Sequence, residues 1–278
     1  MATTLPSNKD ALSVALLAAK RGGDIAQQQR SERAVSISLK AARNLVTTAD
    51  VAAEKVIIET IKIHFPDHKI FAEESTDAED QDLFASGPVW VIDPIDGTTN
   101  YAHGHNHVAV SVAYVVDGIA QAGAVFAPFH GEMFSATKGG GAFCNDKPIK
   151  VSETKTLTEA LIATGFPYER SNIENIARRL LGFLRTCRDI RSLGAASLDI
   201  SWIACGRLDL FYEETLMPWD GVAACLIARE AGARLGRFPY DSESQKKTAK
   251  YGNDLCMDNV IVATPGVFDA ALKLLEES

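Results

Sequence analysis

Two carboxylates follow a short apolar segment in the first half of the chain. Asp93 and Asp96 are separated by a proline and an isoleucine, and Gly97 and Thr98 follow directly. Carboxylate oxygens are hard ligands of the kind that Mg²⁺ prefers, and free N–H groups at Gly97 and Thr98 can bind phosphate oxygens if a turn or short helix begins there. An acidic turn with capping carboxylates is the simpler alternative. Two acids, Pro, Gly and Thr within six residues favour a metal and phosphate site.

Other acids occupy positions from which they can join this pair. Glu73 follows an expected strand, so its side chain can lie beside Asp93 at the same edge of a sheet. Asp220 lies at the start of an expected helix, where an N-cap is the commoner role. Separated acids at the ends of elements fit a two-metal site, in which one carboxylate bridges the ions and positions remain for water and phosphate. The sequence supplies the residue types for such a site, but not their convergence.

The elements that must position these residues differ between the two halves of the chain. Residues 1–151 are predicted to form an α+β half, in which one strand stops at Asp93 and a hairpin turns at Asp117–Gly118. Residues 152–278 alternate strands and helices and are predicted to form an α/β half. Helices are expected at 11–19, 51–64, 171–187, 195–205 and 219–231, with a last one after Pro265. Strands are expected at 69–72, 89–92, 108–116, 119–126, 133–136, 160–164, 208–212 and 260–263.

The composition is that of an ordinary globular protein, with 46% hydrophobic and 23% charged residues among 278. The formal net charge of -8 disfavours a nucleic-acid scaffold, although bound cations can still attract an anionic substrate. Five cysteines without a Cys-x-x-Cys pair favour reduced thiols in a cytoplasmic protein. We expect no signal peptide and no membrane span, because no apolar run approaches the ~20 residues of a membrane helix.

Trp90 with Asp93–Asn100, and the later segment Trp219–Ala224, resemble the two signatures of the inositol monophosphatase family. The resemblance extends from about Asn44 to Ala263. It implies a layered α-β-α-β-α sandwich that assembles as a homodimer. It also implies a Mg²⁺-dependent, Li⁺-sensitive phosphatase that hydrolyses myo-inositol monophosphate or a similar small phosphate monoester by two-metal water activation, without a covalent intermediate. Two or three Mg²⁺ ions are implied for each site, with Mn²⁺ as a substitute.

The resemblance further implies which residues hold the metals. The first metal would be held by Glu73, Asp93 and the carbonyl oxygen of Ile95. The second would be held by Asp93, Asp96 and Asp220, so that Asp93 is the bridge. A third, weaker site stays open, because this chain has an asparagine at position 44, where the family often has aspartate.

The remaining roles implied by the resemblance concern water and substrate. Thr98, paired with Asp50, would orient and deprotonate the attacking water. The substrate would be contacted by a wider set, which consists of Gly97, Thr98, Asp96, Asp220, Gly194, Ala196 and Glu213. The alternating His103, His105 and His107 are unusual after the first signature. They could bind zinc or nickel, or form a surface turn that enters a strand.

Other classes of protein remain open at this point. A phosphatase of the haloacid-dehalogenase type would place its acids two residues apart and use the first as a nucleophile, whereas Asp93 and Asp96 are three apart. A binding or regulatory protein with the same fold, acting in transcription complexes, is a second alternative. Within the family, Asn100 after Gly-Thr-Thr resembles the inositol monophosphatase branch rather than those that often carry Lys after Gly-Thr and act on 3′-phosphoadenosine phosphate or histidinol phosphate. Sugar and nucleotide phosphates also remain open as substrates, since a few loop contacts decide specificity.

Overall fold

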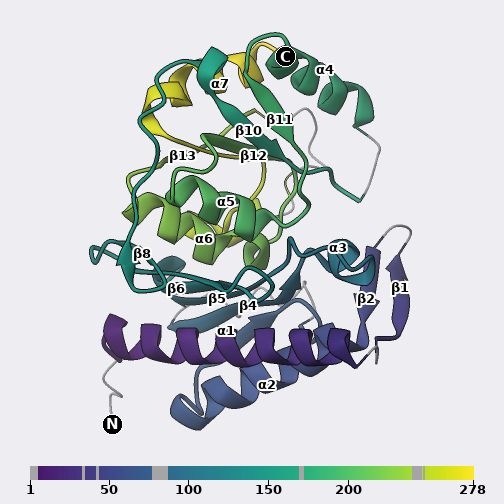
Figure 1. Cartoon of the computed structure of the whole chain (residues 1–278). Helices are drawn as coiled ribbons and strands as arrows, with labels where there is room; N and C mark the ends of the chain where they lie inside the picture. Colours follow the sequence, from purple (N-terminus) through teal and green to yellow (C-terminus); the bar gives the residue numbers. More distant parts are fainter. Residues whose placement is uncertain are drawn as a thin grey trace.

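The computed structural model describes residues 6–32, 35–41, 44–76, 87–168, 172–239, 246 and 248–278, and these form five layers in the order α-β-α-β-α (Figure 1). The outer helices α1 (Asn8–Ser31) and α2 (Thr48–His64) cover one face of the larger sheet. The helices α5 (Ala196–Ala204) and α6 (Pro218–Glu230) lie between the two sheets, and α4 (Ile173–Leu184) and α7 (Pro265–Glu276) cover the far face of the smaller sheet. This layering confirms the predicted fold class.

Both sheets are mixed. The larger one has the order β3-β4-β5-β6-β7-β8-β9, with strands β3 (Lys69–Ala72), β4 (Pro88–Asp96), β5 (Ala109–Val116), β6 (Ile119–Ala127), β7 (Glu132–Thr137), β8 (Ala142–Cys144) and β9 (Lys147–Pro148). The smaller one has the order β11-β10-β12-β14-β13, with strands β10 (Leu161–Thr164), β11 (Asp189–Arg191), β12 (Leu210–Glu213), β13 (Arg234–Arg237) and β14 (Val260–Ala263). A separate hairpin, β1 (Ile37–Ala41) and β2 (Asn44–Thr47), lies beside the short helix α3 (Thr98–Ala102). Three 3₁₀ turns complete the described elements: η2 (Leu157–Glu159), η4 (Ala249–Tyr251) and η5 (Asn253–Leu255).

Small side chains let α1 approach the sheet closely. The helix begins after Ser7, whose hydroxyl accepts a hydrogen bond from the Asp10 N–H at 3.2 Å, as the capping pattern predicts. Its buried face consists largely of alanine and glycine. A Cβ at Gly22 would lie 2.7 Å from Cδ1 of Ile57 on α2, so a larger residue there would force Ile57 to repack.

The strand β4 differs from its prediction in a way that matters for the acids. It was predicted to stop at Asp93, but it continues to Asp96, with a shift of register against β5 between these two residues. Pro94 lies within this shift, where the ladder is interrupted and a missing N–H is tolerated. A bulge of this kind re-aims side chains, and here it delivers two carboxylates at the end of a buried strand.

The hairpin after β5 follows its prediction closely. Asp117 and Gly118 both have positive φ, 51° and 75°, as a type I′ turn requires. The elements missed from the sequence include the β1–β2 hairpin, the short strand β8, the 3₁₀ turns and the strands β11 and β13. The last two are short, charged strands at the edges of the smaller sheet, and such edges lack a clear apolar alternation. Ser171, the expected start of α4, falls outside the described residues.

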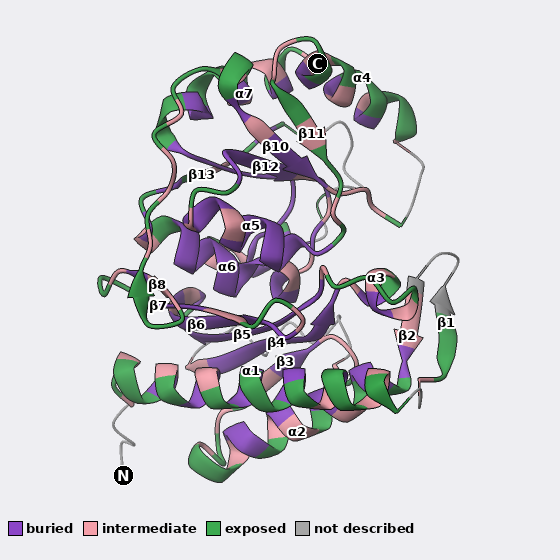
Figure 2. Cartoon of the chain, viewed as in Figure 1, coloured by how far each residue is buried: buried purple, intermediate pink, exposed green. Residues whose placement is uncertain are grey.

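A continuous hydrophobic cluster crosses the middle of the molecule. It includes Val91 and Phe134 from the larger sheet, Leu226 from α6, and Phe211 and Val262 from the smaller sheet. Figure 2 shows that α5 and α6 are mostly buried between the sheets. The division at residue 152 remains a prediction; it falls between β9 and β10, where the chain passes from one sheet to the other. Among the described residues, no helix is both long enough and apolar enough to cross a membrane.

Candidate active site

Gly97 forms the junction between β4 and α3. Its φ of 90° is in the left-handed region, which favours glycine. A Cβ at this position would also lie 3.1 Å from the carbonyl oxygen of Gly194 and 3.2 Å from Cβ of Ala195. The start of α3 is therefore pressed against the segment that leads into α5, and the predicted site residues Gly97, Gly194 and Ala196 lie in one place.

Thr98 begins α3 and contacts α2. Its hydroxyl oxygen lies 3.1 Å from Oδ1 of Asp50 and 3.0 Å from the carbonyl oxygen of Ile95. The other carboxylate oxygen of Asp50 accepts hydrogen bonds from the N–H (2.8 Å) and hydroxyl (2.5 Å) of Thr47. Burial raises the pKa of Asp50, and the hydrogen bonds from Thr47 and Thr98 oppose this. The structure thus brings together the pair that the resemblance named; the catalytic role of the pair stays a prediction.

Asp93 lies at the centre of the acids. It is only 2% exposed, and its Oδ1 accepts a hydrogen bond from the Ile95 N–H at 3.0 Å. Glu73 is adjacent, since its N–H donates to the carbonyl oxygen of Ile92 at 3.2 Å. The pKa of Asp93 is raised well above its usual value, first by burial and then by the negative charges of Glu73, Asp96 and Asp220. Three of the acids predicted to hold metals therefore act through space on Asp93, the fourth.

Asp220 reaches this group from the other half of the chain. It lies in the first turn of α6, where its Oδ2 accepts a hydrogen bond from the Met217 N–H at 2.7 Å. It therefore caps the helix from inside the first turn rather than from the N-cap position. Burial, Glu73 and Asp96 raise its pKa well above the usual value. This cap fixes the backbone of the first turn, so the helix determines the direction of the Asp220 carboxylate.

These acids fit a divalent cation by their chemistry. Within the described parts of the chain, no three His, Cys, Asp or Glu side chains are already gathered around a common point. Glu73 and Asp96 are nevertheless close enough to raise the pKa values of Asp93 and Asp220. Buried carboxylates that repel one another are costly unless a positive charge compensates them, and an all-oxygen set is the donor set of a hard cation.

Ser197 is a site residue that the sequence analysis missed. Its N–H (2.7 Å) and hydroxyl (2.5 Å) both donate to Oδ2 of Asp96. The side chain is fully buried in the first turn of α5. Burial raises the pKa of Asp96, whereas the hydrogen bonds from Ser197 lower it. The signal available in the sequence was its position directly after Gly194–Ala196, a segment that had been selected for substrate contact.

The alternating histidines do not act as one group. His103 and His105 are exposed, whereas His107 lies 2.7 Å from Asp199 of α5 through its Nε2. Burial lowers the pKa of His107 to about 4. The carbonyl oxygens of His107 and Leu193 both accept hydrogen bonds from Asn100 Nδ2, at 2.8 and 2.6 Å. These contacts tie α3 to the loop before α5, which is a positioning role.

Two further residues, one at the end of β12 and one in the loop after β10, interact electrostatically with the acids. Glu213 ends β12 and raises the pKa of Asp220; its carboxylate lies against Gly165, so a side chain at position 165 would require Glu213 to move. Tyr168 lies three residues after Gly165, and it is 49% exposed. Its pKa is raised by burial and then by Asp220 and the other acids of the group. Tyr168 was not selected from the sequence, because a tyrosine in a connecting loop carries no signal by itself.

The layered fold, with acids at the ends of β3 and β4 and in the first turn of α6, is shared with known phosphoric monoester hydrolases. The pattern of the inositol monophosphatase family matches residues 7–276. The chain belongs to this family.

Individual relatives agree with this assignment. "Nus factor SuhB" of Escherichia coli (strain K12) is 37% identical over 265 residues, which cover 94% of both chains. "Inositol monophosphatase 1" of Solanum lycopersicum is 38% identical over 249 residues, which cover 87% of this chain and 91% of the relative. Among solved structures, the extragenic suppressor protein SuhB from Bartonella henselae has a TM-score of 0.85 at 30% identity, with 97% of this chain and 99% of that one covered. The inositol monophosphatase from Anabaena sp. PCC 7120 has a TM-score of 0.81 at 32% identity, with 97% and 96% covered.

Proposed function

We propose that this protein is a Mg²⁺-dependent phosphatase that hydrolyses myo-inositol monophosphate or a similar small phosphate monoester. The observation that carries the proposal is that Glu73 and Asp96 raise the pKa values of both Asp93 and Asp220, although these four acids come from three separate segments. Reduced, unpaired thiols at all five described cysteines support a cytoplasmic location. Family membership supports a homodimer.

The acids divide between two metal positions. Glu73, Asp93 and the carbonyl oxygen of Ile95 would hold one Mg²⁺, and Asp93, Asp96 and Asp220 would hold the other. When bound, such ions lower the pKa of a coordinated water and neutralise charge on the phosphate and the leaving oxygen. Mn²⁺ offers the same hard, octahedral preference and is the expected substitute.

Thr98 and Asp50 act on the attacking water. Thr98 can direct its proton to Asp50, at 3.1 Å, and its oxygen can then accept a hydrogen bond from water. Burial raises the pKa of Asp50, which makes its carboxylate a better proton acceptor than an exposed aspartate. The water attacks phosphorus directly, and no residue of the chain becomes phosphorylated.

The amides of Gly97 and Thr98 lie at the start of α3, where they can donate to phosphate oxygens. Gly194, Ala196 and Glu213 would contact the alcohol part of the substrate. A carboxylate such as that of Glu213 accepts hydrogen bonds from hydroxyl groups, so it favours a polyol over an apolar alcohol.

The direct test is phosphate release from a panel of monoesters. We expect myo-inositol 1-phosphate to be hydrolysed with Mg²⁺ and not with excess EDTA, and sugar and nucleotide monophosphates to be ranked behind it. Failure of every monoester with Mg²⁺ and with Mn²⁺ would refute the proposal. Trapping a phosphoenzyme would refute the direct attack by water.

A second function is favoured by one comparison. The relatives that share 37% identity over 94% of the chain are named Nus factors, and we propose an added role for this protein in a transcription complex. Its net charge of -8 favours a protein partner over bare nucleic acid. Salt-dependent binding of RNA by the isolated protein would instead indicate direct contact with nucleic acid.

A further inference from the structure

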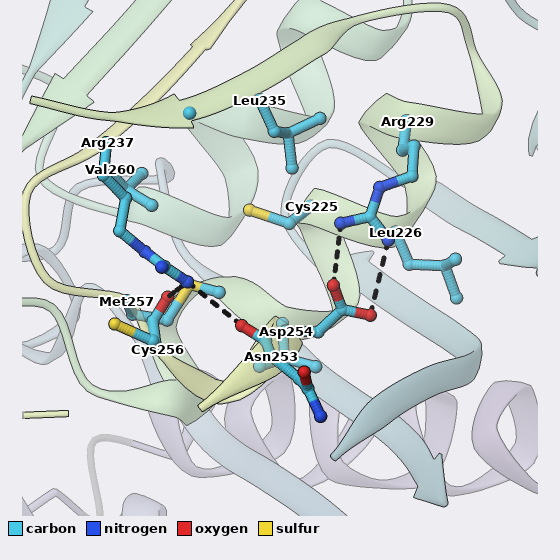
Figure 3. A pocket seen from close by; sticks show the side chains of 12 residues that line it. Cys225, Leu226, Arg229, Leu235, Arg237, Asn253, Asp254, Cys256, Met257 and Val260 are labelled. Carbon is cyan, nitrogen blue, oxygen red and sulfur yellow. Dashed lines mark hydrogen bonds and ion pairs between the residues drawn. The ribbon is translucent and has the colours of Figure 1, made fainter. Parts of the chain in front are cut away.

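A cavity of about 320 Å³ lies beside α6, between β13 and η5 (Figure 3). Its wall is largely apolar, with Val222 and Leu226 from α6, Leu235 from β13 and Val260 from β14. No residue placed above in the candidate active site belongs to its lining. A volume of this size is at the lower end of the range for small-molecule sites.

Two arginines enter this cavity from opposite sides, with Cys225 between them (Figure 3). Arg229 forms two contacts with Asp254, at 2.8 and 3.3 Å, so its charge is neutralised. Arg237 differs, because its Nη2 donates to the carbonyl oxygens of Asn253 and Cys256, both at 3.0 Å. Among the described residues, Arg237 forms no ion pair with a carboxylate. The cavity therefore carries one unbalanced positive charge beside an apolar wall.

The rim of the cavity is held in place from outside. Gly252 and Asn253 both have positive φ, 63° and 44°. The Asp254 N–H donates to the carbonyl oxygen of Gly118 at 3.1 Å, and Asp254 Oδ2 accepts from the Ala120 N–H at 3.0 Å. The β5–β6 hairpin thus fixes η5, so a ligand would meet a largely pre-formed site and lose little free energy in ordering it.

The head group of a fitting ligand is limited by Arg237. Both hydrogens of its Nη2 are directed to carbonyl oxygens, which leaves Nη1 and Nε as donors. A monocarboxylate matches the single excess positive charge of the lining, whereas the dianion of a phosphate monoester exceeds it. The apolar wall requires a hydrocarbon body.

The cavity is connected to the candidate active site through α6. Four of its lining residues, Val222, Cys225, Leu226 and Arg229, lie on the helix whose first turn carries Asp220. On the opposite wall Met257 packs against the next residue of that turn, since a Cβ at Gly221 would lie 2.6 Å from its Sδ. A ligand in the cavity therefore packs against Met257 and α6, which hold the turn that carries Asp220.

We propose that this cavity is a regulatory site for a small organic monocarboxylate with an apolar body, whose carboxylate binds Arg237 and whose occupancy lowers turnover at the candidate active site through α6. Binding stands independently of the proposed phosphatase function, whereas the effect on turnover rests on it.

The experiment is calorimetric titration of the full chain with hexanoate, with the neutral hexanamide as the matched ligand. We expect saturable binding of hexanoate and binding of hexanamide that is weaker by about tenfold or more, because a charge-assisted hydrogen bond is lost. Arg237→Gln should weaken hexanoate binding by about tenfold or more. Arg234→Gln should not, since Arg234 lies on the same strand outside the cavity and contacts Asp269 at 2.7 Å. Leu235→Phe should weaken the binding of both ligands, because the larger side chain fills the cavity. This variant tests the site if the Arg237 variant does not fold.

Three outcomes would overturn the proposal in whole or in part. Absence of saturable hexanoate binding, or binding that both cavity variants leave unchanged, would exclude the site. Binding with unaltered phosphate release at saturating hexanoate, where a fall of about twofold or more is expected, would exclude the regulatory role alone. Loss of all phosphatase activity in the unliganded protein would refute the proposed function and leave the binding result unaffected.

Discussion

The strands β4 and β7 of the same sheet each carry an acid, and the surroundings shift the pKa values of these two acids in opposite directions. Glu132 of β7 forms a two-pronged ion pair with Arg207, whose Nη1 lies 2.7 Å from Oε2, and Arg207 lowers its pKa. Asp93 of β4 lies among Glu73, Asp96 and Asp220, which raise its pKa together with burial. The fold can therefore neutralise an acid with arginine. At the end of β4 it gathers acids instead, which costs folding free energy and is typical of a site that binds a cation.

The largest expected effect is the loss of turnover when the acids at β4 are neutralised. Asp93→Asn should lower kcat on the order of a thousandfold, because the bridging carboxylate between two cations is removed. Asp220→Asn should act similarly. Glu132→Gln is the control on the other strand and should leave kcat within about twofold. Phosphate release at saturating Mg²⁺ measures all three, and near-normal turnover of either aspartate variant would contradict the metal assignment.

Thr98→Ala should lower kcat by about a hundredfold, within the usual contribution of a positioned proton acceptor. KM should change little, because the amide that faces the phosphate survives. Thr99→Ala is a close control, since Thr99 is in the same helix and exposed. A rise in KM at constant kcat would show that Thr98 binds substrate and does not act on the water.

Lithium should distinguish the two metal positions at the acids. Li⁺ resembles Mg²⁺ in size but has half its charge, so at the position held by Asp93, Asp96 and Asp220 it would stabilise the leaving oxygen less well. We expect inhibition of about tenfold that added substrate does not relieve. Steady-state rates in Li⁺ and in Na⁺ of equal ionic strength provide the measurement, and equal rates would mean that the second position is tighter or differently built.

A smaller effect is expected at Glu213, which lies beyond the metal ligands. Glu213→Gln should change the ranking of inositol, sugar and nucleotide phosphates by about three- to tenfold, since one hydrogen bond to a hydroxyl is weakened. The Mg²⁺ dependence should stay the same. An unchanged ranking across the panel would remove Glu213 from the substrate contacts.

The smallest expected effect is on the free energy of unfolding, measured in EDTA. It tests directly whether Asp93 of β4 and Glu132 of β7 have opposite effects on stability. The raised pKa of Asp93 means that its charged form opposes folding above the ordinary value of 3.8, so Asp93→Asn should raise the free energy of unfolding at pH 7. The pKa of Glu132 is lowered, so its ion pair with Arg207 stabilises the folded state above pH 4.5, the ordinary pKa. This stabilisation is lost as the pH falls through the lowered pKa. Glu132→Gln should therefore destabilise at pH 7, by less than about 1 kcal/mol. Denaturant unfolding at pH 7 and pH 4 measures both, and shifts of the same sign at pH 7 would break the comparison.

Sequence reasoning selected residues that the structure places together where chemistry was concentrated in short motifs, while the roles of these residues stay predictions. The acids at Asp93 and Asp96 were found from residue types alone, and the pairing of Thr98 with Asp50, 48 positions apart, came from the resemblance. It failed where the signal depends on neighbours brought together by folding. Ser197 donates to Asp96 across 101 positions, and a single buried serine has no periodicity that would reveal this. The bulge in β4 was also missed, because proline after Asp93 is ordinarily a sign that a strand ends.

The contact between Asp96 and Ser197 has a thermodynamic consequence. One carboxylate is both a proposed ligand of the second cation and the acceptor that anchors the first turn of α5 through two hydrogen bonds, at 2.7 and 2.5 Å. Linkage requires that two processes sharing one group affect each other by equal amounts of free energy. Cation binding at Asp96 therefore changes the free energy of local opening of α5, and this opening changes the affinity for the cation by the same amount. The rate at which the Ser197 amide proton exchanges with solvent thus reports cation binding inside the middle layer.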